Sequence, residues 1–216
     1  MKCDKNNESI LKVHEIFDSI DGEGKRAGKL VTFIRLTGCN LRCSYCDTAY
    51  AFVAGEDMTV AEVLSRVHYP DVTITGGEPL LQNLHPLLRK MQNRCVNIET
   101  NGSISIRPYL DYPHVFFTMD FKCRSSGMTR DMFPPNFREL RKRDVLKFVV
   151  GSREDLEQAL AFCRKQKPKC QVYASPVFGS IEPKDIVAFM KEHHLEDWKV
   201  QLQLHKFIWN PQERGV

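Results

Sequence analysis

Three cysteines lie close together in the chain, at a spacing that suits metal chemistry. Cys39, Cys43 and Cys46 form a C-x3-C-x2-C pattern, whereas the remainder of the eight cysteines are scattered. Three thiolates on one short loop can bind a soft metal or an iron–sulfur cluster. A structural zinc site closes with four ligands and usually pairs two such motifs, and the sequence holds no second motif. The pattern therefore favours a [4Fe–4S] cluster with one iron open to another ligand, and it leaves zinc or redox thiols as the alternative.

The elements that must position this loop are predicted from apolar runs. Short runs rich in valine, isoleucine and phenylalanine indicate buried strands at residues 31–36, 72–75, 96–99, 115–119, 145–150, 172–174 and 200–204. Helical patterns lie between them: Thr59 and Glu62 form a capping box, Ser152 and Asp155 open a second helix, and Pro183 fits a first turn. Alternating strands and helices predict an α/β fold with parallel strands. Because a complete eight-unit barrel takes about 250 residues, we expect an incomplete, TIM-like barrel.

Polar residues follow most of these predicted strands. They are Thr37-Gly38-Cys39-Asn40, Gly76-Gly77-Glu78-Pro79, Thr100-Asn101-Gly102, Asp120 with Lys122, Ser175, and His205. Parallel α/β folds place their active sites at the carboxyl ends of strands, so we expect one shared site. Arg35 lies within a predicted buried strand, and a buried guanidinium needs an anion, which is either a ligand or a protein carboxylate.

Composition sets the broad class of the protein. With 42% hydrophobic and 27% charged residues the 216-residue chain is expected to be globular, as a single domain over residues 1–216 with an N-terminal tail at 1–14. The net charge of +4 does not by itself indicate nucleic-acid binding. No apolar run approaches the roughly 18 residues of a membrane span, and the first eight residues are polar. We expect a cytoplasmic protein.

Residues 123–143 carry an unusual local charge. The segment contains six Lys or Arg side chains and two acidic ones, a net charge of +4. We interpret it first as a solvated, partly disordered connection. A second hypothesis is a docking surface for an acidic electron donor such as a flavodoxin. In that case, reversal of the charges of Arg141 and Arg143 should slow reduction by flavodoxin.

The cysteine loop resembles that of radical S-adenosylmethionine (SAM) enzymes. Tyr45 precedes the last cysteine, and Gly-Gly-Glu-Pro follows at residues 76–79, as in that superfamily. A wider set of segments is similar to the 7-carboxy-7-deazaguanine synthase family. These segments are Glu-Ile-Phe-Asp-Ser-Ile-Asp-Gly-Glu-Gly at 15–24, Phe-Ile-Arg at 33–35, Ile-Glu-Thr-Asn-Gly at 98–102 and Leu-Gln-Leu-His-Lys at 202–206. The resemblance thus extends over nearly the whole chain.

The resemblance implies a reaction and its cofactors. A [4Fe–4S] cluster on the three cysteines would chelate SAM, whose one-electron cleavage releases a 5′-deoxyadenosyl radical. In the family this radical takes a hydrogen atom from 6-carboxy-5,6,7,8-tetrahydropterin. The pterin ring then contracts with loss of ammonia to 7-carboxy-7-deazaguanine, a precursor of queuosine and related deazapurines, and SAM is re-formed. Mg²⁺ is the third cofactor implied, and a homodimer is the family's expected state.

The resemblance also assigns residues to these ligands. Contacts to SAM are implied for Tyr45, Asp47, Gly76, Gly77, Glu78, Gly102, Asp120 and Lys122. Contacts to the pterin are implied for Ile20, Asp21, Gly22, Glu23, Arg35, Thr100 and His205. Thr48 would be a magnesium ligand, because a hydroxyl is a hard oxygen of the kind Mg²⁺ prefers. On residue types alone, Thr48 would be a helix or turn cap and His205 a structural histidine.

The chain departs from the family pattern in three places. Asp21 stands where many relatives have Gln, and Asp120-Phe121-Lys122 replaces a more usual Ser-Pro-Lys. Residues 207–216 form a longer tail than in relatives whose terminal carboxylate lies near the substrate, so no site is assigned there.

Two other classes of protein compete with this interpretation. Another small radical SAM enzyme, such as an activase of glycyl-radical enzymes, would share the cysteine motif but would not need a buried Arg35. A zinc-stabilised module that binds RNA through the basic segment is the non-enzymatic alternative. A brown protein with broad absorbance near 400 nm after anaerobic purification would separate the cluster from zinc.

Overall fold

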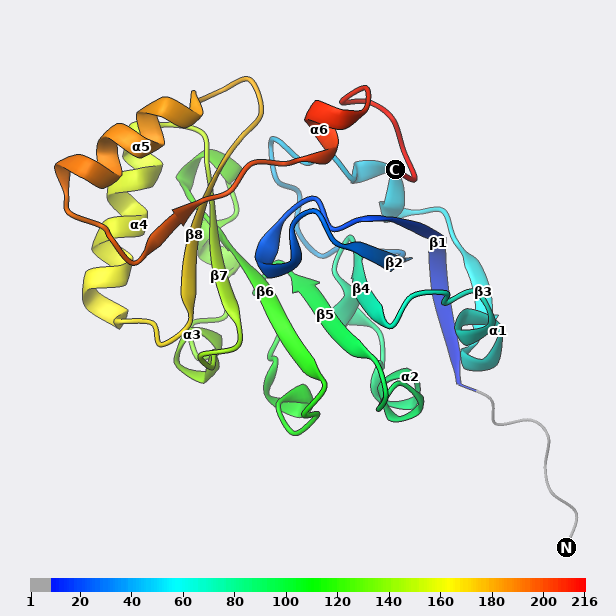
Figure 1. Cartoon of the computed structure of the whole chain (residues 1–216). Helices are drawn as coiled ribbons and strands as arrows, with labels where there is room; N and C mark the ends of the chain where they lie inside the picture. The colour runs from blue at the N-terminus through cyan, green and yellow to red at the C-terminus, as the bar shows by residue number, and fades with distance from the viewer. Residues whose placement is uncertain (1–8) are drawn as a thin grey trace, which may run out of the picture.

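The computed structural model describes residues 9–216, which form a curved sheet with helices on its outer side (Figure 1). The strands are β1 Ile10–Ile20, β2 Leu30–Leu36, β3 Glu56–Thr59, β4 Asp71–Gly76, β5 Cys95–Thr100, β6 Val115–Lys122, β7 Val145–Val150, β8 Gln171–Pro176 and β9 Trp198–Val200. The α-helices are α1 Val60–Ser65, α2 His85–Lys90, α3 Asn136–Glu139, α4 Arg153–Gln166, α5 Pro183–Glu192 and α6 His205–Ile208. No helix in this part of the chain is long and apolar enough to cross a membrane.

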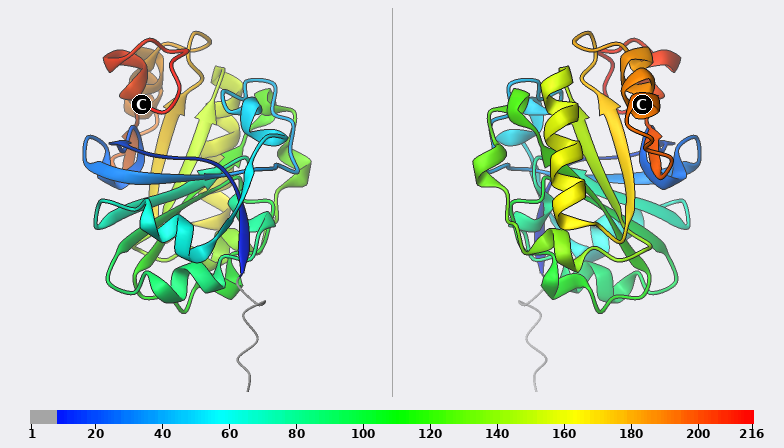
Figure 2. Two further views of the ribbon diagram at one scale, coloured as in Figure 1. Left: turned by 90° about the vertical axis from the view of Figure 1, so that its right-hand side faces the viewer. Right: turned by 90° about the vertical axis from the view of Figure 1, so that its left-hand side faces the viewer.

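All these strands belong to one sheet with the order β3-β1-β2-β4-β5-β6-β7-β8-β9. From β2 to β9 neighbouring strands are parallel, whereas β1 is antiparallel to both β2 and β3. The order is linear, so the edge strands β3 and β9 do not pair with each other. Figure 2 shows the resulting open curve, with α4 and α5 packed outside it. The predicted incomplete barrel is confirmed.

The strands alternate between an apolar outer face and a polar inner face. In β4, Val72 and Ile74 are fully buried in the core beneath the helices, whereas Thr75 faces the interior pocket. The same alternation turns inward Glu99 of β5, Asp120 and Lys122 of β6, and Lys147 of β7. Small complete barrels fill their interior with bulky apolar side chains. This interior is polar instead, which suits the binding of a polar ligand.

The predicted helix starts are confirmed. The Thr59 hydroxyl accepts from the Glu62 backbone N–H, and the Glu62 carboxylate accepts in return from the Thr59 N–H, so the capping box is complete. The Ser152 side chain accepts from the Asp155 N–H at the start of α4. Pro183 is the first residue of α5.

Two expectations about elements are wrong, and one strand was missed. The predicted tail at 1–14 is shorter, because Ile10–Ile20 is strand β1 and buries Leu11 and Val13 in the core; residues 1–8 lie outside the described part. The last predicted strand, 200–204, is displaced to β9, because after the N–H of Gln201 donates to Ala174 the chain turns toward α6. Strand β3 was not predicted.

The basic segment 123–143 is ordered by short helices instead of forming a solvated connection. It contains two 3-10 turns, Arg124–Ser126 and Thr129–Asp131, followed by α3. Phe137 and Leu140 are buried in the core. Arg141 pairs with Asp144 at 2.8 Å and donates to the carbonyls of Leu110 and Val115. Its guanidinium therefore has a structural role.

Candidate active site

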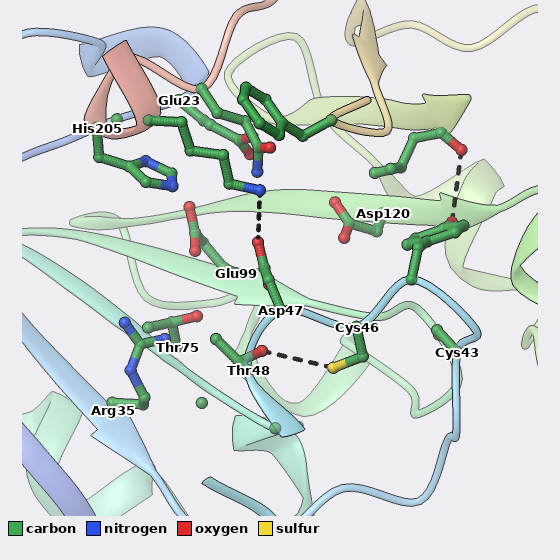
Figure 3. Close-up of a pocket in the computed structure, with 18 of the residues that line it drawn as sticks. Glu23, Arg35, Cys43, Cys46, Asp47, Thr48, Thr75, Glu99, Asp120 and His205 are labelled. Atoms are coloured by element: carbon green, nitrogen blue, oxygen red, sulfur yellow. Dashed lines mark hydrogen bonds and ion pairs between the residues drawn. The ribbon is translucent and has the colours of Figure 1, made fainter. Parts of the chain in front are cut away.

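One pocket of about 730 Å³ lies inside the curved sheet, toward the carboxyl ends of the parallel strands. It contains the cysteine loop and most of the predicted polar residues. Figure 3 shows Cys43 and Cys46 on one side of the pocket, Arg35 with Thr75 on another, and Glu99, Asp47 and His205 facing a common space. The expectation of a single shared site is therefore supported by the fold.

The cysteine loop follows β2 directly and is shaped by backbone hydrogen bonds. Cys39, Cys43 and Cys46 are unpaired thiols, half-buried, and all three line the pocket. The Cys46 N–H donates to the Cys43 carbonyl at 3.2 Å, which turns the loop. The Ser44 N–H donates to the Ser126 carbonyl at 3.1 Å and fixes the loop against the basic segment. The sequence thus places three thiols on one rigid support.

The donor set fits an iron–sulfur cluster. Thiolates are the protein ligands of such clusters, and hydrogen bonds to their sulfur atoms tune them. The Leu41 N–H donates to Cys39 Sγ at 3.4 Å, and the Asn101 side-chain amide donates to the same sulfur at 3.7 Å. No group of three His, Cys, Asp or Glu side chains in the described residues converges on a point suited to a single metal ion.

Gly76 and Gly77 are required where the loop after β4 passes the cysteine loop. Gly76 has φ +146°, and a Cβ there would lie 2.1 Å from the Leu36 carbonyl oxygen. A Cβ on Gly77 would lie 2.2 Å from the Gly38 carbonyl oxygen. Both glycines line the pocket, so the close approach that excludes side chains also exposes backbone to a ligand.

Glu78 does not reach the pocket, which differs from the predicted contact with SAM. Its side chain is fully buried, and its carboxylate accepts from the N–H groups of Leu80 at 3.0 Å and Asn101 at 2.6 Å. The Thr100 hydroxyl also donates to it, at 2.9 Å. Burial raises the pKa of Glu78 to about 7, although these donors oppose the shift. These hydrogen bonds link the loop after β4 to the end of β5. The Thr100 hydroxyl donates its proton to Glu78 and is not free to donate to a ligand.

Replacement of Glu78 by alanine is expected to destabilise the fold. It would leave two backbone N–H groups and the Thr100 hydroxyl buried without an acceptor, a loss of about 2–5 kcal/mol. Urea unfolding monitored by circular dichroism measures the difference. The control is Glu56→Ala, at an exposed position of β3, which should change stability by less than about 0.5 kcal/mol. Equal stability of the two variants would contradict this role.

The remaining residues predicted to contact SAM divide into two groups. Tyr45, Asp47, Asp120 and Lys122 line the pocket. Gly102 does not line it: its φ is +76°, and a Cβ would lie 2.8 Å from the Met132 methyl group, so this glycine serves a turn. Lys122 Nζ lies 2.8 Å from Asp120 Oδ2, and Lys206 Nζ lies 3.2 Å from Asp47 Oδ2.

The residues predicted to contact the pterin all line the pocket. Asp21, however, has structural partners: its side chain is buried and pairs with Arg26 at 3.0 Å, while Thr73 donates to it. Burial raises the pKa of Asp21, and Arg26 acts in the opposite direction. Its backbone N–H and carbonyl are bonded to Lys29 and Gly28. The carboxylate that replaces the more usual amide is thus neutralised within the protein.

Arg35 has a protein partner and also keeps donors for a ligand. Its Nε donates to Glu15 Oε1 at 2.6 Å, so the structural ion pair is present. Its two terminal nitrogens donate to no acceptor in the described residues, and the side chain lines the pocket at 13% exposure. Guanidinium groups bind carboxylates through such paired N–H groups. Arg35 can therefore form the ion pair with Glu15 and bind an anionic ligand at the same time.

His205 is the first residue of α6 and not, as expected, the end of a strand. It lies against Gly22, where a Cβ would come within 2.4 Å of the imidazole Nδ1. The N–H of Leu204 also donates to the Gly22 carbonyl, which ties the segment after β1 to the segment before α6. Burial lowers the pKa of His205, so the ring is neutral at neutral pH.

Several pocket residues were missed from the sequence, among them the C-terminal residues 211–216, to which no site was assigned. Thr75, Glu99 and Lys147 face inward from β4, β5 and β7. Lys147 alternates with the apolar Leu146 and Phe148, the same signal that identified Arg35. Glu99 accepts no hydrogen bond from the described residues, and burial raises its pKa to about 7.

Comparisons with known proteins agree with this geometry. The model of the radical SAM superfamily matches residues 33–192. A 7-carboxy-7-deazaguanine synthase of Clostridium acetobutylicum is 46% identical over 95% of this chain and 99% of its own length. One of Methanospirillum hungatei is 40% identical over 94% of this chain and 87% of its own length.

A solved structure supports the fold. The crystal structure of QueE from Escherichia coli superposes with a TM-score of 0.71 at 21% identity, covering 90% of this chain and 94% of the other. The cysteine loop, the matched superfamily region and the full-length similarity point to one assignment. The chain belongs to the radical SAM superfamily and, within it, to the 7-carboxy-7-deazaguanine synthase family.

Proposed function

We propose that the chain converts 6-carboxy-5,6,7,8-tetrahydropterin into 7-carboxy-7-deazaguanine and ammonia. The observation that carries this conclusion is the 46% identity to a synthase of that name over nearly the full length of both chains. Substrate and product differ by one ammonia, so the conversion is a lyase reaction with no net oxidation. The glycyl-radical activase and the zinc-binding module are not favoured by the relatives found.

Membership of the superfamily implies a [4Fe–4S] cluster and SAM. Cys39, Cys43 and Cys46 would hold the cluster, which together with SAM supplies a radical able to abstract a hydrogen atom. The backbone at Gly76 and Gly77 would approach the methionine part of SAM, since no Cβ holds it away. Asp120 and Lys122, Tyr45 and Asp47 line the same pocket and complete the candidate SAM contacts.

The pterin would lie between Arg35 and the segment after β1. The terminal nitrogens of Arg35 would bind the substrate carboxylate, and neutral His205 would hydrogen-bond to the substrate. Ile20, Gly22 and Glu23 lie at the other end, where the amino-pyrimidinone ring offers donors and acceptors. For Thr100 no free donor supports a contact, and Thr75 is the better candidate.

Thr48 would bind Mg²⁺ near the substrate. Its hydroxyl lies on the pocket wall, 3.7 Å from Cys46 Sγ, and Mg²⁺ prefers hard oxygen ligands with water and substrate oxygens completing the shell. The substrate carboxylate would be such a ligand. A homodimer is the family's expected state and is proposed on that ground.

The electron donor is proposed to dock beside the cysteine loop. Arg42, Arg124 and Arg130 are exposed, and the last two follow the carboxyl end of β6, next to the residues that hold the loop. Arg141 and Arg143 precede β7 at the opposite end of the strands and are bonded to backbone carbonyls. Arg141 and Arg143, which the sequence suggested as part of a docking surface, therefore lie away from the cysteine loop.

The double variant Arg124→Glu/Arg130→Glu should slow reduction by flavodoxin about tenfold or more at low salt, because like charges oppose association with an acidic protein. Turnover with dithionite should be unchanged. The matched control reverses two exposed charges of the same segment near the other end of the strands, Arg138→Glu/Lys142→Glu (Figure 1). Stopped-flow reduction measures both, and equal rates for the two double variants would remove this docking surface.

Anaerobic incubation tests the reaction itself. The reconstituted protein is supplied with carboxytetrahydropterin, SAM, Mg²⁺ and a reductant, and the deazapurine is identified by mass and ultraviolet spectrum. Product formation supports the proposed function. Its absence, with the cluster and SAM bound, would count against it.

A further inference from the structure

Lys147 is a buried cation in the pocket that neither the cysteine motif nor the glycine motif identifies. It lies at the middle of β7, where its neighbours Leu146 and Phe148 are fully buried in the core on the opposite face. Its own side chain is 9% exposed and lines the pocket. A lysine in such a place needs anionic partners, since removal of an ammonium from water costs several kcal/mol.

Those partners come from two separate parts of the chain. The ammonium contacts Glu23 Oε2, in the segment after β1, and lies 3.1 Å from Asp120 Oδ1 on β6. The other oxygen of Asp120 pairs with Lys122. Burial lowers the pKa of Lys147, but Asp120, Glu23 and Glu99 together raise it well above its usual value, so the ammonium is retained.

Lys147 belongs to a charged cluster of five side chains in this part of the pocket. Glu23, Glu99 and Asp120 contribute three negative charges when ionised, and Lys122 and Lys147 contribute two positive ones. Without Lys147, three carboxylates from β5, β6 and the segment after β1 would face one another with one ammonium. Glu23 has no other ion-pair partner in the described residues, so repulsion would displace it and its segment.

We propose that Lys147 is a positioning residue that holds the pterin-contacting segment at Glu23 in register with the SAM-contacting residue Asp120. The proposal rests on the proposed function, because it assigns Glu23 to the binding of the pterin and Asp120 to the binding of SAM. Lys147 itself performs no chemical step. Its effect is to keep the two ends of the pocket at a fixed separation.

The test compares Lys147→Met, which removes the charge, with Lys147→Arg, which keeps it. The matched control is Lys199→Met, an exposed lysine on β9. With iron content and thermal stability measured for each variant, we expect Lys147→Met to raise the KM for carboxytetrahydropterin roughly 30- to 200-fold, as for removal of one partner of a buried ion pair. The kcat should change less than about tenfold, and Lys147→Arg should recover most of the loss. If Lys147 only stabilised the fold, Lys147→Met would lower the amount of folded enzyme but leave its KM for the pterin unchanged.

Binding of carboxytetrahydropterin by anaerobic calorimetry gives the same comparison without turnover. An unchanged dissociation constant in Lys147→Met, or an arginine variant no better than methionine, overturns the proposal. If Lys147→Met does not fold, the double variant Lys147→Met/Glu99→Gln removes one positive and one negative group from the charged cluster around Lys147. Wild-type affinity for the pterin in that double variant would likewise overturn the proposal. Wild-type protein that binds the pterin but forms no deazapurine would argue against the proposed function alone.

Discussion

Replacement of Cys43 by alanine is expected to abolish deazapurine formation and the absorbance near 400 nm. Among the described residues, the three thiols of the loop are the only ones that line the pocket, so loss of one leaves the cluster with one ligand too few. Iron and sulfide content, the visible spectrum and product formation should fall together, with activity reduced to background.

The control for this result is Cys95→Ala. Cys95 is exposed at the start of β5, at the opposite end of the strands. Its backbone carbonyl, and not its thiol, accepts a hydrogen bond from Arg26. This variant should keep its iron and its activity. An iron-loaded, active Cys43→Ala protein would contradict the assignment of the cluster to this loop.

Replacement of Arg35 by methionine should lower kcat/KM for carboxytetrahydropterin by roughly 150- to 5,000-fold. A buried carboxylate that loses its guanidinium partner costs about 3–5 kcal/mol. Steady-state kinetics on the anaerobic enzyme measure the change. A tetrahydropterin that lacks the carboxylate should bind equally well to both proteins, because this ligand offers Arg35 no carboxylate to bind.

Arg35 also pairs with Glu15, so the structural part of its effect has to be separated. The double variant Arg35→Met/Glu15→Gln removes the uncompensated carboxylate of the protein. Activity should stay low in this variant if the terminal nitrogens of Arg35 bind substrate. Recovery to near wild-type activity would show that Arg35 serves only to neutralise Glu15.

The sheet could be predicted because its parallel strands bury one apolar face. The runs that became β2, β4 and β7 are rich in valine, isoleucine and phenylalanine and need no tertiary information to be recognised. Strand β1 was missed because polar residues interrupt it, among them Glu15 and Asp18, and its pairing with β2 and β3 is what makes it a strand.

The residues that line the candidate site were predicted more completely than the hydrogen bonds and ion pairs that they form with one another. Motif similarity identified the cysteine loop, Arg35 and His205, which all line the pocket. It could not show that Glu78 turns away to bind the N–H groups of Leu80 and Asn101, because side-chain direction in a loop depends on the neighbouring strand. Lys147 was missed although its apolar neighbours mark it as inward-facing, since its importance depends on carboxylates from β6 and the segment after β1.

The central claim is that one pocket brings the cluster, SAM and the pterin together for hydrogen transfer. Carboxytetrahydropterin deuterated on its ring carbons tests it most directly, in anaerobic turnover with SAM, Mg²⁺ and a reductant, followed by mass spectrometry of product and SAM. The account predicts that the deazapurine forms and that deuterium from the pterin appears in SAM. Cleavage of SAM to unlabelled 5′-deoxyadenosine, with the pterin unchanged, would contradict it.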